Sequence, residues 1–213
     1  MSTLRLLLVR HGQTESNVRS VLDSRPPGPP LTATGWRQAL ELAERLAAEP
    51  VVAVYSSVAV RAVETASVVA GRHGLDVRVT DGLHEVFCGD YEGSNARADV
   101  EAFVGVYRAW HAGDVDLQAP GGESGRQVLD RVLPVVSRIR REHADGVVVL
   151  VGHSAALRLV GSTLAANVEA VFADSHFLPN CQAITLEATD GDGWRCLDWA
   201  GVTPPSAGAH PPV

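Results

Sequence analysis

Two short apolar runs, each ending beside a histidine, constrain the fold of this chain most strongly. The first, LRLLLV at 4–9, leads into Arg10-His11-Gly12, and the second, VVVLV at 147–151, leads into Gly152-His153. Short, nearly continuous apolar runs are typical of strands that are covered on both faces. Strands of this kind belong to a sheet that has helices on both sides.

Amphipathic segments alternate with these and further strand-like runs. Additional strands are predicted at 51–55 and at 77–79, the latter near a sheet edge, and a closing pair at 184–186 and 194–197. Apolar residues at helical spacing predict helices at 34–48, 59–70, 128–139 and 155–166. Pro134 is expected to bend the third of these helices or to lie near its first turn. The order of elements predicts a three-layer α/β/α sandwich with a mainly parallel central sheet.

The composition is that of one packed domain followed by a tail. The chain has 213 residues, of which 46% are apolar and 20% charged. From Thr203 the sequence reads TPPSAGAHPPV, which has too few apolar side chains to offset the entropy of ordering it. We therefore expect one domain over residues 1–202 and a flexible Pro-rich tail over residues 203–213.

Charge and cysteine content exclude several classes of protein. The net charge of −7 argues against nucleic acid and anionic membranes as main partners. All 18 basic residues are arginine, so chemistry that needs a lysine is excluded. No apolar run is long enough to span a membrane and the N-terminus does not resemble a signal peptide, which predicts a soluble, cytoplasmic protein. The three cysteines, Cys88, Cys181 and Cys196, are expected to be buried thiols.

Basic side chains follow three of the predicted strands. Arg10 and His11 follow the first strand, His153 follows the 147–151 strand, and Arg61 lies in the first turns of the helix after the 51–55 strand. Ligands of parallel sheets bind outside the carboxyl ends of the strands, so these four side chains should meet in one crevice. Guanidinium groups match phosphate oxygens, and the helix that begins near Ser154 can add backbone N–H groups. The pattern predicts a site for a phosphoryl group.

Several longer motifs carry a family resemblance. They are LLLVRHGQTESN at 6–17, PLTATGWRQA at 30–39, YSSVAVRAVETA at 55–66, LHEVFCGDYEG at 83–93, PGGES at 120–124, VGHSAALR at 151–158 and LPNC at 178–181. In this order and spacing they resemble the histidine phosphatase superfamily, also called the phosphoglycerate mutase-like family. The resemblance covers roughly residues 4 to 199.

The resemblance implies a role for each matching residue. His11 would be the nucleophile that becomes phosphorylated, and Glu85 the proton donor. The phosphoryl oxygens would be held by Arg10, Asn17, Arg61 and His153. Ser154 stands where the family commonly has glycine, and its hydroxyl can cap the following helix or bind the phosphate. The implied activity is that of a phosphomonoesterase that acts on a small phosphorylated metabolite through a phosphohistidine, with no cofactor and no metal.

Phosphoryl transfer by a mutase is the first alternative. Mutases typically carry a longer insertion with basic residues after the glutamate motif, whereas segment 95–119 is short and its arginines, Arg97 and Arg108, are far apart. Hydrolysis is therefore favoured. Segment 95–119 is expected to cover the pocket. The candidates to contact the leaving group are Phe103, Tyr107, Trp110 and His111, but the first three have the spacing i, i+4, i+7 and would alternatively form the buried stripe of a helix.

Two further alternatives come from other classes. GHSAA at 152–156 resembles the G-x-S-x-G elbow of serine esterases, which would make Ser154 the nucleophile and His176 or His210 its partner. Against this, the fifth position is Ala156 and the RHG motif would have no role. A non-catalytic phosphate-binding module would be expected to lack part of the pocket, and no part is missing. The sequence leaves the oligomeric state open, a homodimer included.

Overall fold

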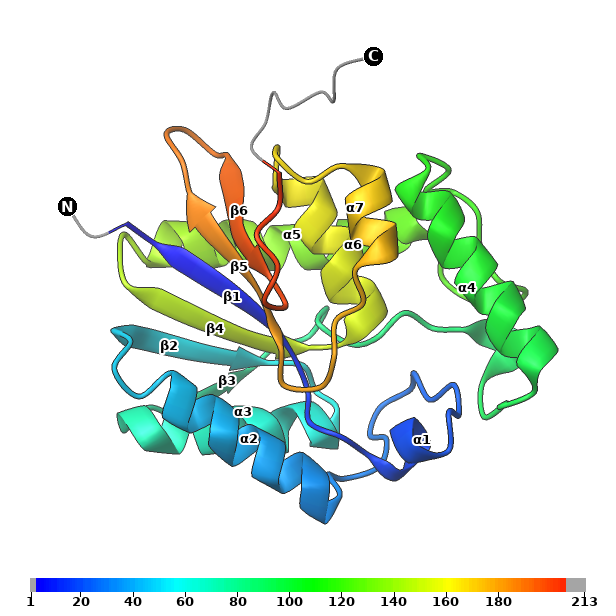
Figure 1. Cartoon of the computed structure of the whole chain (residues 1–213), viewed down its shortest axis with the longest axis horizontal. Coiled ribbons are helices and arrows are strands. Elements are labelled where there is room, and N and C mark those ends of the chain that lie inside the picture. Colours follow the sequence, from blue (N-terminus) through cyan, green and yellow to red (C-terminus); the bar gives the residue numbers. More distant parts are fainter. Residues whose placement is uncertain (1–2, 206–213) are drawn as a thin grey trace.

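A six-stranded sheet forms the centre of the molecule (Figure 1). The computed structural model describes residues 3–205. The strand order is β3-β2-β4-β1-β5-β6. Strands β1 to β4 are parallel to one another, and β5 is antiparallel to both of its neighbours, β1 and β6. The strands are β1 Arg5–Arg10, β2 Val51–Ser56, β3 Val77–Val79, β4 Val147–Gly152, β5 Ala183–Ala188 and β6 Trp194–Trp199. The predicted strands and the mainly parallel sheet are confirmed, and β3 lies at an edge as expected.

Helices cover both faces of this sheet. One face carries α2 (Ala33–Arg45) and α3 (Val60–His73), and the other carries α5 (Gly125–Glu142) and α6 (Ser154–Leu164) (Figure 1). Three further helices are α1 Glu15–Val18, α4 Arg97–His111 and α7 Ala170–Ser175, and a short 3₁₀ helix, η1, spans Gly89–Tyr91. Both α1 and α4 lie beyond the carboxyl ends of the parallel strands (Figure 1). The α/β/α sandwich predicted from the sequence is confirmed.

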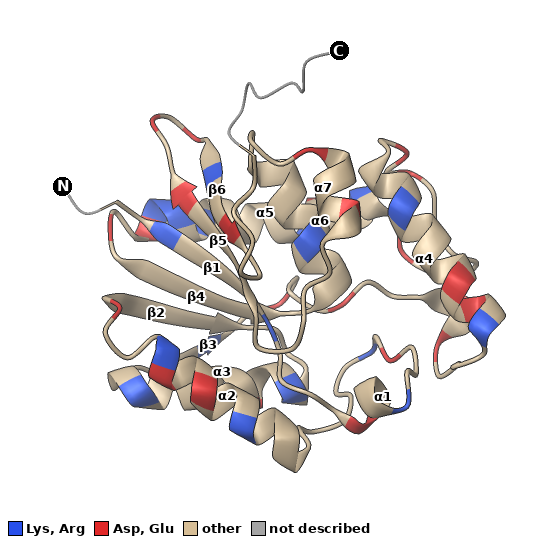
Figure 2. Cartoon of the chain, in the orientation of Figure 1, with Lys and Arg blue, Asp and Glu red and all other residues tan. Residues whose placement is uncertain are grey.

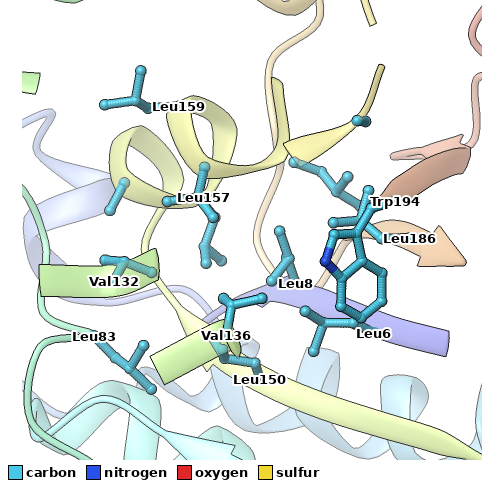
Figure 3. Close-up of a cluster of buried hydrophobic side chains, with 14 of the residues drawn as sticks. Leu6, Leu8, Leu83, Val132, Val136, Leu150, Leu157, Leu159, Leu186 and Trp194 are labelled. Atoms are coloured by element: carbon cyan, nitrogen blue, oxygen red, sulfur yellow. The ribbon is translucent and has the colours of Figure 1, made fainter. Parts of the chain in front are cut away.

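Alternate side chains of β1 enter two separate apolar layers. Leu6 and Leu8 pack in the layer formed with α5 and α6, as Figure 3 shows, whereas Leu7 and Val9 pack in the layer formed with α2 and α3. Burial of each such side chain contributes about 1.5–3 kcal/mol. The two layers hold β1 rigidly, and with it the loop that begins at its carboxyl end.

Charge is absent from β2 and β4, whereas β1 carries an arginine at each of its two ends. Figure 2 shows arginine, aspartate and glutamate mainly on helices and loops, while β2 and β4 carry none of them. All six residues of β4 are buried. A charge in this position would have to lose its hydration without a partner, which is costly.

Pro134 lies in the middle of α5, so the expectation that it would lie near the first turn is wrong. The helix begins earlier than the apolar stripe suggested, at a capping box in which Ser124 and Gln127 each accept the other's backbone N–H. Burial of Val128, Val132 and Ile139 on one face outweighs the hydrogen bond that proline cannot donate.

Three other expectations concern the cysteines, membrane-spanning segments and the C-terminal tail. The three cysteines are buried and free. In residues 3–205, no helix has the length and apolar character to cross a membrane. Most of the predicted tail, residues 206–213, lies outside the described residues.

Candidate active site

The carboxyl ends of β1 and β4 lie side by side. Arg10 pairs in register with Gly152, and the backbone N–H of His11 donates to the Gly152 carbonyl at 3.0 Å. Beside them the N–H of Ser57, after β2, donates to Val151 at 2.9 Å. A cavity of about 120 Å³ opens at this edge, and its walls include Arg10, His11, Asn17, Arg61 and Glu85. The parallel strands thus bring together residues from distant parts of the chain.

His11 is buried, and both of its ring nitrogens have partners. Nδ1 lies 2.7 Å from the carbonyl oxygen of Gly12, and Nε2 lies 3.2 Å from Nε of Arg61. Since a guanidinium can only donate, Nε2 accepts, and the proton of the neutral ring is therefore on Nδ1. Burial, with the charges of Arg61 and Arg10 adding to it, holds the pKa of His11 well below its usual value. The ring is a neutral imidazole whose Nε2 lone pair accepts the hydrogen bond of Arg61.

Arg61 reaches this position from the first turn of α3 and is only 2% exposed. Its Nη2 donates to the backbone carbonyl of Asp23 at 3.1 Å, and its Nη1 lies 4.0 Å from the Asp23 carboxylate. Gly28 passes so close that a Cβ there would lie 2.0 Å from Nη1. The guanidinium is therefore fixed from two sides, by Asp23 and by the Gly28 backbone.

Arg10 forms the second cation of the site. Its Nη1 donates to the Leu178 carbonyl at 3.1 Å, and its guanidinium carbon lies 5.1 Å from the ring centre of Phe177. Among the described residues, three buried nitrogens at this edge have no hydrogen-bond partner: Nε of Arg10, Nη1 of Arg61 and Nδ1 of His153. A buried polar group without a partner is costly. The oxygens of a phosphoryl group would supply acceptors to the guanidinium donors.

His153 is fully buried next to His11. The two ring centres are 5.1 Å apart, and Nε2 of His153 lies 2.9 Å from Oγ of Ser57. Burial, then Arg61 and His11, hold the pKa of His153 well below its usual value. Both histidines of the site are therefore neutral near pH 7.

The carboxylate of Glu85 lies at the start of α6. It accepts hydrogen bonds from the backbone N–H groups of Val86, Ala155 and Ala156, at 2.9, 3.3 and 3.1 Å. The unpaired N–H groups of a helix start favour an anion at this place. The carboxylate is thus held by backbone groups of α6 and of its own loop.

Arg131, on α5, fixes the backbone of the same loop and was not predicted from the sequence. It donates to the carbonyls of Gly82, His84 and Glu85 at 2.7 to 3.2 Å, and it pairs with Glu123 at 2.9 Å. Burial would raise the pKa of Glu123, but hydrogen bonds from His84 and Arg131 lower it to about 2. An ionised Glu123 thereby holds Arg131 against the loop.

Asn17 lies on the cavity wall, and its orientation is set by two donors. Its Oδ1 accepts from the N–H of Thr14 at 3.1 Å and from Nδ2 of Asn180 at 3.2 Å. Asn180 also donates to the carbonyl of His11 at 2.8 Å, a role that sequence reasoning missed although the LPNC motif contains this residue.

Ser154 is the first residue of α6, and its hydroxyl lies 3.4 Å from the Leu178 carbonyl. The expectation that Ser154 caps the helix is wrong, because His153 occupies the N-cap position. Within residues 3–205, no histidine lies within hydrogen-bond distance of its hydroxyl, as a serine nucleophile would need. Nδ1 of His176 instead lies 2.8 Å from the Phe172 carbonyl, and His210 is outside the described residues.

Segment 95–119 folds mainly as α4, and its aromatic residues divide between two roles. Phe103 lines the cavity, whereas Tyr107, Trp110 and His111 are buried against the core. Tyr107 and Trp110 follow the expected buried stripe, and Phe103 packs against the same core while it also lines the cavity. In the part of the chain that the structure describes, no cluster of three or more His, Cys, Asp and Glu is arranged to hold a metal ion.

Comparisons with known proteins match nearly the whole chain. The family model of the histidine phosphatase superfamily (branch 1) matches residues 6–201. A PE-PGRS family protein of Mycobacterium tuberculosis is 31% identical over 91% of the chain, which spans only 36% of that relative's length. Phosphoglycerate mutase-like protein 4 of Arabidopsis thaliana is 30% identical over 93% of the chain and 85% of its own length. The vanadate (VO3) complex of a mycobacterial glucosyl-3-phosphoglycerate phosphatase superposes with a TM-score of 0.79, at 29% identity, over 95% of this chain and all of that one.

Proposed function

This chain belongs to the histidine phosphatase superfamily, and we propose that it hydrolyses phosphate monoesters of small metabolites through a phosphohistidine on His11, without a metal ion. The observation that carries the proposal is the neutral, buried imidazole of His11, whose Nε2 faces the Arg61 guanidinium at 3.2 Å. A nucleophile and a permanent cation next to each other suit an electrophilic, negatively charged phosphorus centre.

Substrate binding follows from the donors at the cavity. The phosphoryl oxygens accept from Arg10 and Arg61, whose buried nitrogens Nε and Nη1 have no partner among the described residues. We propose that His153 and Asn17 also bind the phosphoryl oxygens. The hydroxyl of Ser154, at the start of α6, is proposed as an additional donor to them. These fixed donors stabilise the charge on the equatorial oxygens without having to reorient during the reaction.

In the first chemical step Nε2 of His11 attacks phosphorus in line with the ester oxygen. The N–P bond forms as the P–O bond to the leaving group breaks. Glu85, whose protonated form is favoured by the negative charge of the bound substrate, gives its proton to the departing alkoxide. Nδ1 remains bonded to the Gly12 carbonyl, which stabilises the positive charge that develops on the ring. The products of this step are the free alcohol and phosphohistidine.

In the second step water hydrolyses the phosphohistidine. Glu85, now ionised, accepts a proton from the water as its oxygen attacks phosphorus and the N–P bond breaks. Phosphate leaves, Nε2 regains its lone pair and Glu85 is again protonated. One water is consumed, and one alcohol and one phosphate are released.

Hydrolysis is favoured over mutase-type transfer by the positions of two arginines. Arg97 pairs with Glu101 and Arg108 lies 3.6 Å from Asp174, and neither lines the cavity. A mutase would need basic groups there to retain the dephosphorylated intermediate. The cytoplasmic location stays a prediction, and the oligomeric state stays open.

The test is a p-nitrophenyl phosphate assay in the presence of a chelator, followed by mass analysis of the enzyme adduct after an alkaline quench, since phosphohistidine is acid-labile. We expect turnover and a phosphoryl group on His11, both lost in His11→Ala and both kept in His73→Ala, a control at the far end of α3. Substantial turnover by His11→Ala would remove His11 as the nucleophile. Cleavage of p-nitrophenyl acetate without phosphatase activity would instead identify Ser154.

A further inference from the structure

Segment 21–25 forms one wall of the cavity although it contains no helix or strand. Val21, Leu22, Asp23 and Ser24 all line the cavity. Two backbone hydrogen bonds join this segment to the loop before α4: the N–H of Leu22 donates to Ser94 at 2.9 Å, and the N–H of Gly93 donates to Leu22 at 2.7 Å. The wall therefore depends on a loop nearly seventy positions later in the chain for its shape.

Glu92 makes the strongest connection between the two loops. Its carboxylate accepts from the backbone N–H groups of Ser24 at 2.8 Å and Arg25 at 3.3 Å, from the Ser24 hydroxyl, and from the Cys88 thiol at 3.0 Å. A carboxylate only accepts, so it satisfies these four donors together. Burial would raise the pKa of Glu92, but the hydrogen bonds from Ser24 and Cys88 lower it, so the group is ionised at neutral pH.

Asp23, which lies between Leu22 and Ser24, holds Arg61 in place. Asp23 accepts the Nη2 hydrogen bond of Arg61 on its backbone carbonyl at 3.1 Å, and its carboxylate lies 4.0 Å from Nη1. Leu22, on one side of Asp23, is fixed by Ser94 and Gly93, and Ser24, on the other side, is fixed by Glu92. The position of the Asp23 carbonyl is thus set by its two neighbours.

We infer that Glu92 is a positioning residue: by fastening Ser24 and Arg25 it holds the Asp23 carbonyl where that carbonyl aims the Arg61 guanidinium at His11 and at the phosphoryl group. The inference rests on the proposed function, because it assigns Glu92 an effect only through the role of Arg61. Glu92 itself does not line the cavity.

Glu92→Gln tests the inference with almost no change of volume. Its carbonyl oxygen can still accept from the N–H groups of Ser24 and Arg25, but its NH₂ replaces the oxygen that accepts from the Ser24 hydroxyl and the Cys88 thiol, and the negative charge of the anchor is lost. We expect the inhibition constant of vanadate, and the dissociation constant of phosphate measured by calorimetry, to rise about tenfold, since a charged hydrogen bond to the oxyanion is displaced.

The discriminating measurement is a double-mutant cycle with Arg61→Ala. If Glu92 acts through Arg61, Glu92→Gln should weaken vanadate binding less than about twofold in the Arg61→Ala background, because coupled residues are not additive. The matched control is Asp99→Asn. It neutralises the carboxylate that accepts from the Ser94 hydroxyl in the same loop, and Asp99 has no hydrogen bond to segment 21–25. Its vanadate affinity should equal that of the unsubstituted chain.

Additive losses in the cycle, or vanadate affinity unchanged in Glu92→Gln, would overturn the inference while leaving the proposed function intact. If the unsubstituted chain binds neither phosphate nor vanadate, the proposed function fails and the inference with it. Should thermal unfolding show that Glu92→Gln does not fold, Ser24→Ala enters the same cycle, since it removes one donor and leaves the carboxylate in place. We expect a smaller loss from Ser24→Ala, again absent in the Arg61→Ala background.

Discussion

Nε of Arg61 donates to Nε2 of His11 across 3.2 Å, so the cation covers the lone pair of the group that we propose as the nucleophile. The contact keeps the ring neutral and fixes its tautomer. A phosphoryl oxygen that replaces His11 as the acceptor of this N–H would free the lone pair at the moment phosphorus arrives. Binding and activation of the nucleophile would then be one event.

Arg61→Ala should weaken vanadate and phosphate binding by about 1.5–3 kcal/mol, roughly 10- to 150-fold, because a charged hydrogen bond to the oxyanion is lost. Inhibition kinetics measure the effect. Arg72→Ala, in the exposed last turn of the same helix, is the control and should bind vanadate normally. An unchanged inhibition constant in Arg61→Ala would show that the guanidinium does not contact the ligand.

Gly28→Ala should damage the site more than the fold. Gly28 and Gly74 both have a φ near +65°, so alanine costs about 1 kcal/mol of backbone strain at either position. Only at Gly28 would the new Cβ also collide with Nη1 of Arg61. We expect similar losses of melting temperature in Gly28→Ala and Gly74→Ala, but a loss of vanadate affinity in the first alone. Equal vanadate affinities would contradict the close contact.

Glu85→Gln should reduce turnover of alkyl phosphates far more than turnover of p-nitrophenyl phosphate. An alkoxide needs a proton in order to leave, whereas p-nitrophenolate leaves without one. The comparison of kcat/KM on the two substrates is the measurement, with the exposed Glu101→Gln as the control. Equal losses on both substrates would point to a different acid.

Stability should fall as the pH drops below about 6.5, the ordinary pKa of histidine. His111 is buried beside Tyr107, and burial, with the charge of Arg158, lowers its pKa to about 4. Between these two values the unfolded chain binds a proton that the folded chain does not, which favours unfolding. We expect His111→Gln to flatten the fall in melting temperature between pH 6.5 and 4. An unchanged slope would mean that His111 is already charged in the folded protein.

The parts of the fold that could be predicted are those whose signal is local. The runs that became β1 and β4 are apolar because both faces are covered, and a parallel sheet brings their carboxyl ends to one edge. These two facts were enough to expect His11 and His153 side by side. The family motifs added Glu85 and Asn17, which strand ends alone did not single out.

The contacts that could not be predicted join loops that are distant in sequence. Asp23 meets Arg61, Asn180 meets His11, and Arg131 meets the backbone of Glu85, and no periodicity marks any of these pairs. Of the two expectations for Pro134, a place near the first turn of α5 failed for a related reason: a proline restricts its own turn, but the burial that keeps α5 intact comes from the whole domain.

The central position of β1 and β4 in the strand order also separates two kinds of motion. Both strands are flanked by paired strands on either side and covered on both faces, so their amides should exchange with deuterium only when the whole domain unfolds. The loop of Glu92 and the α4 segment lie outside this sheet, so we expect their amides to exchange by local opening. The proposed nucleophile would then follow directly on a slowly exchanging strand, while parts of the cavity wall would exchange faster.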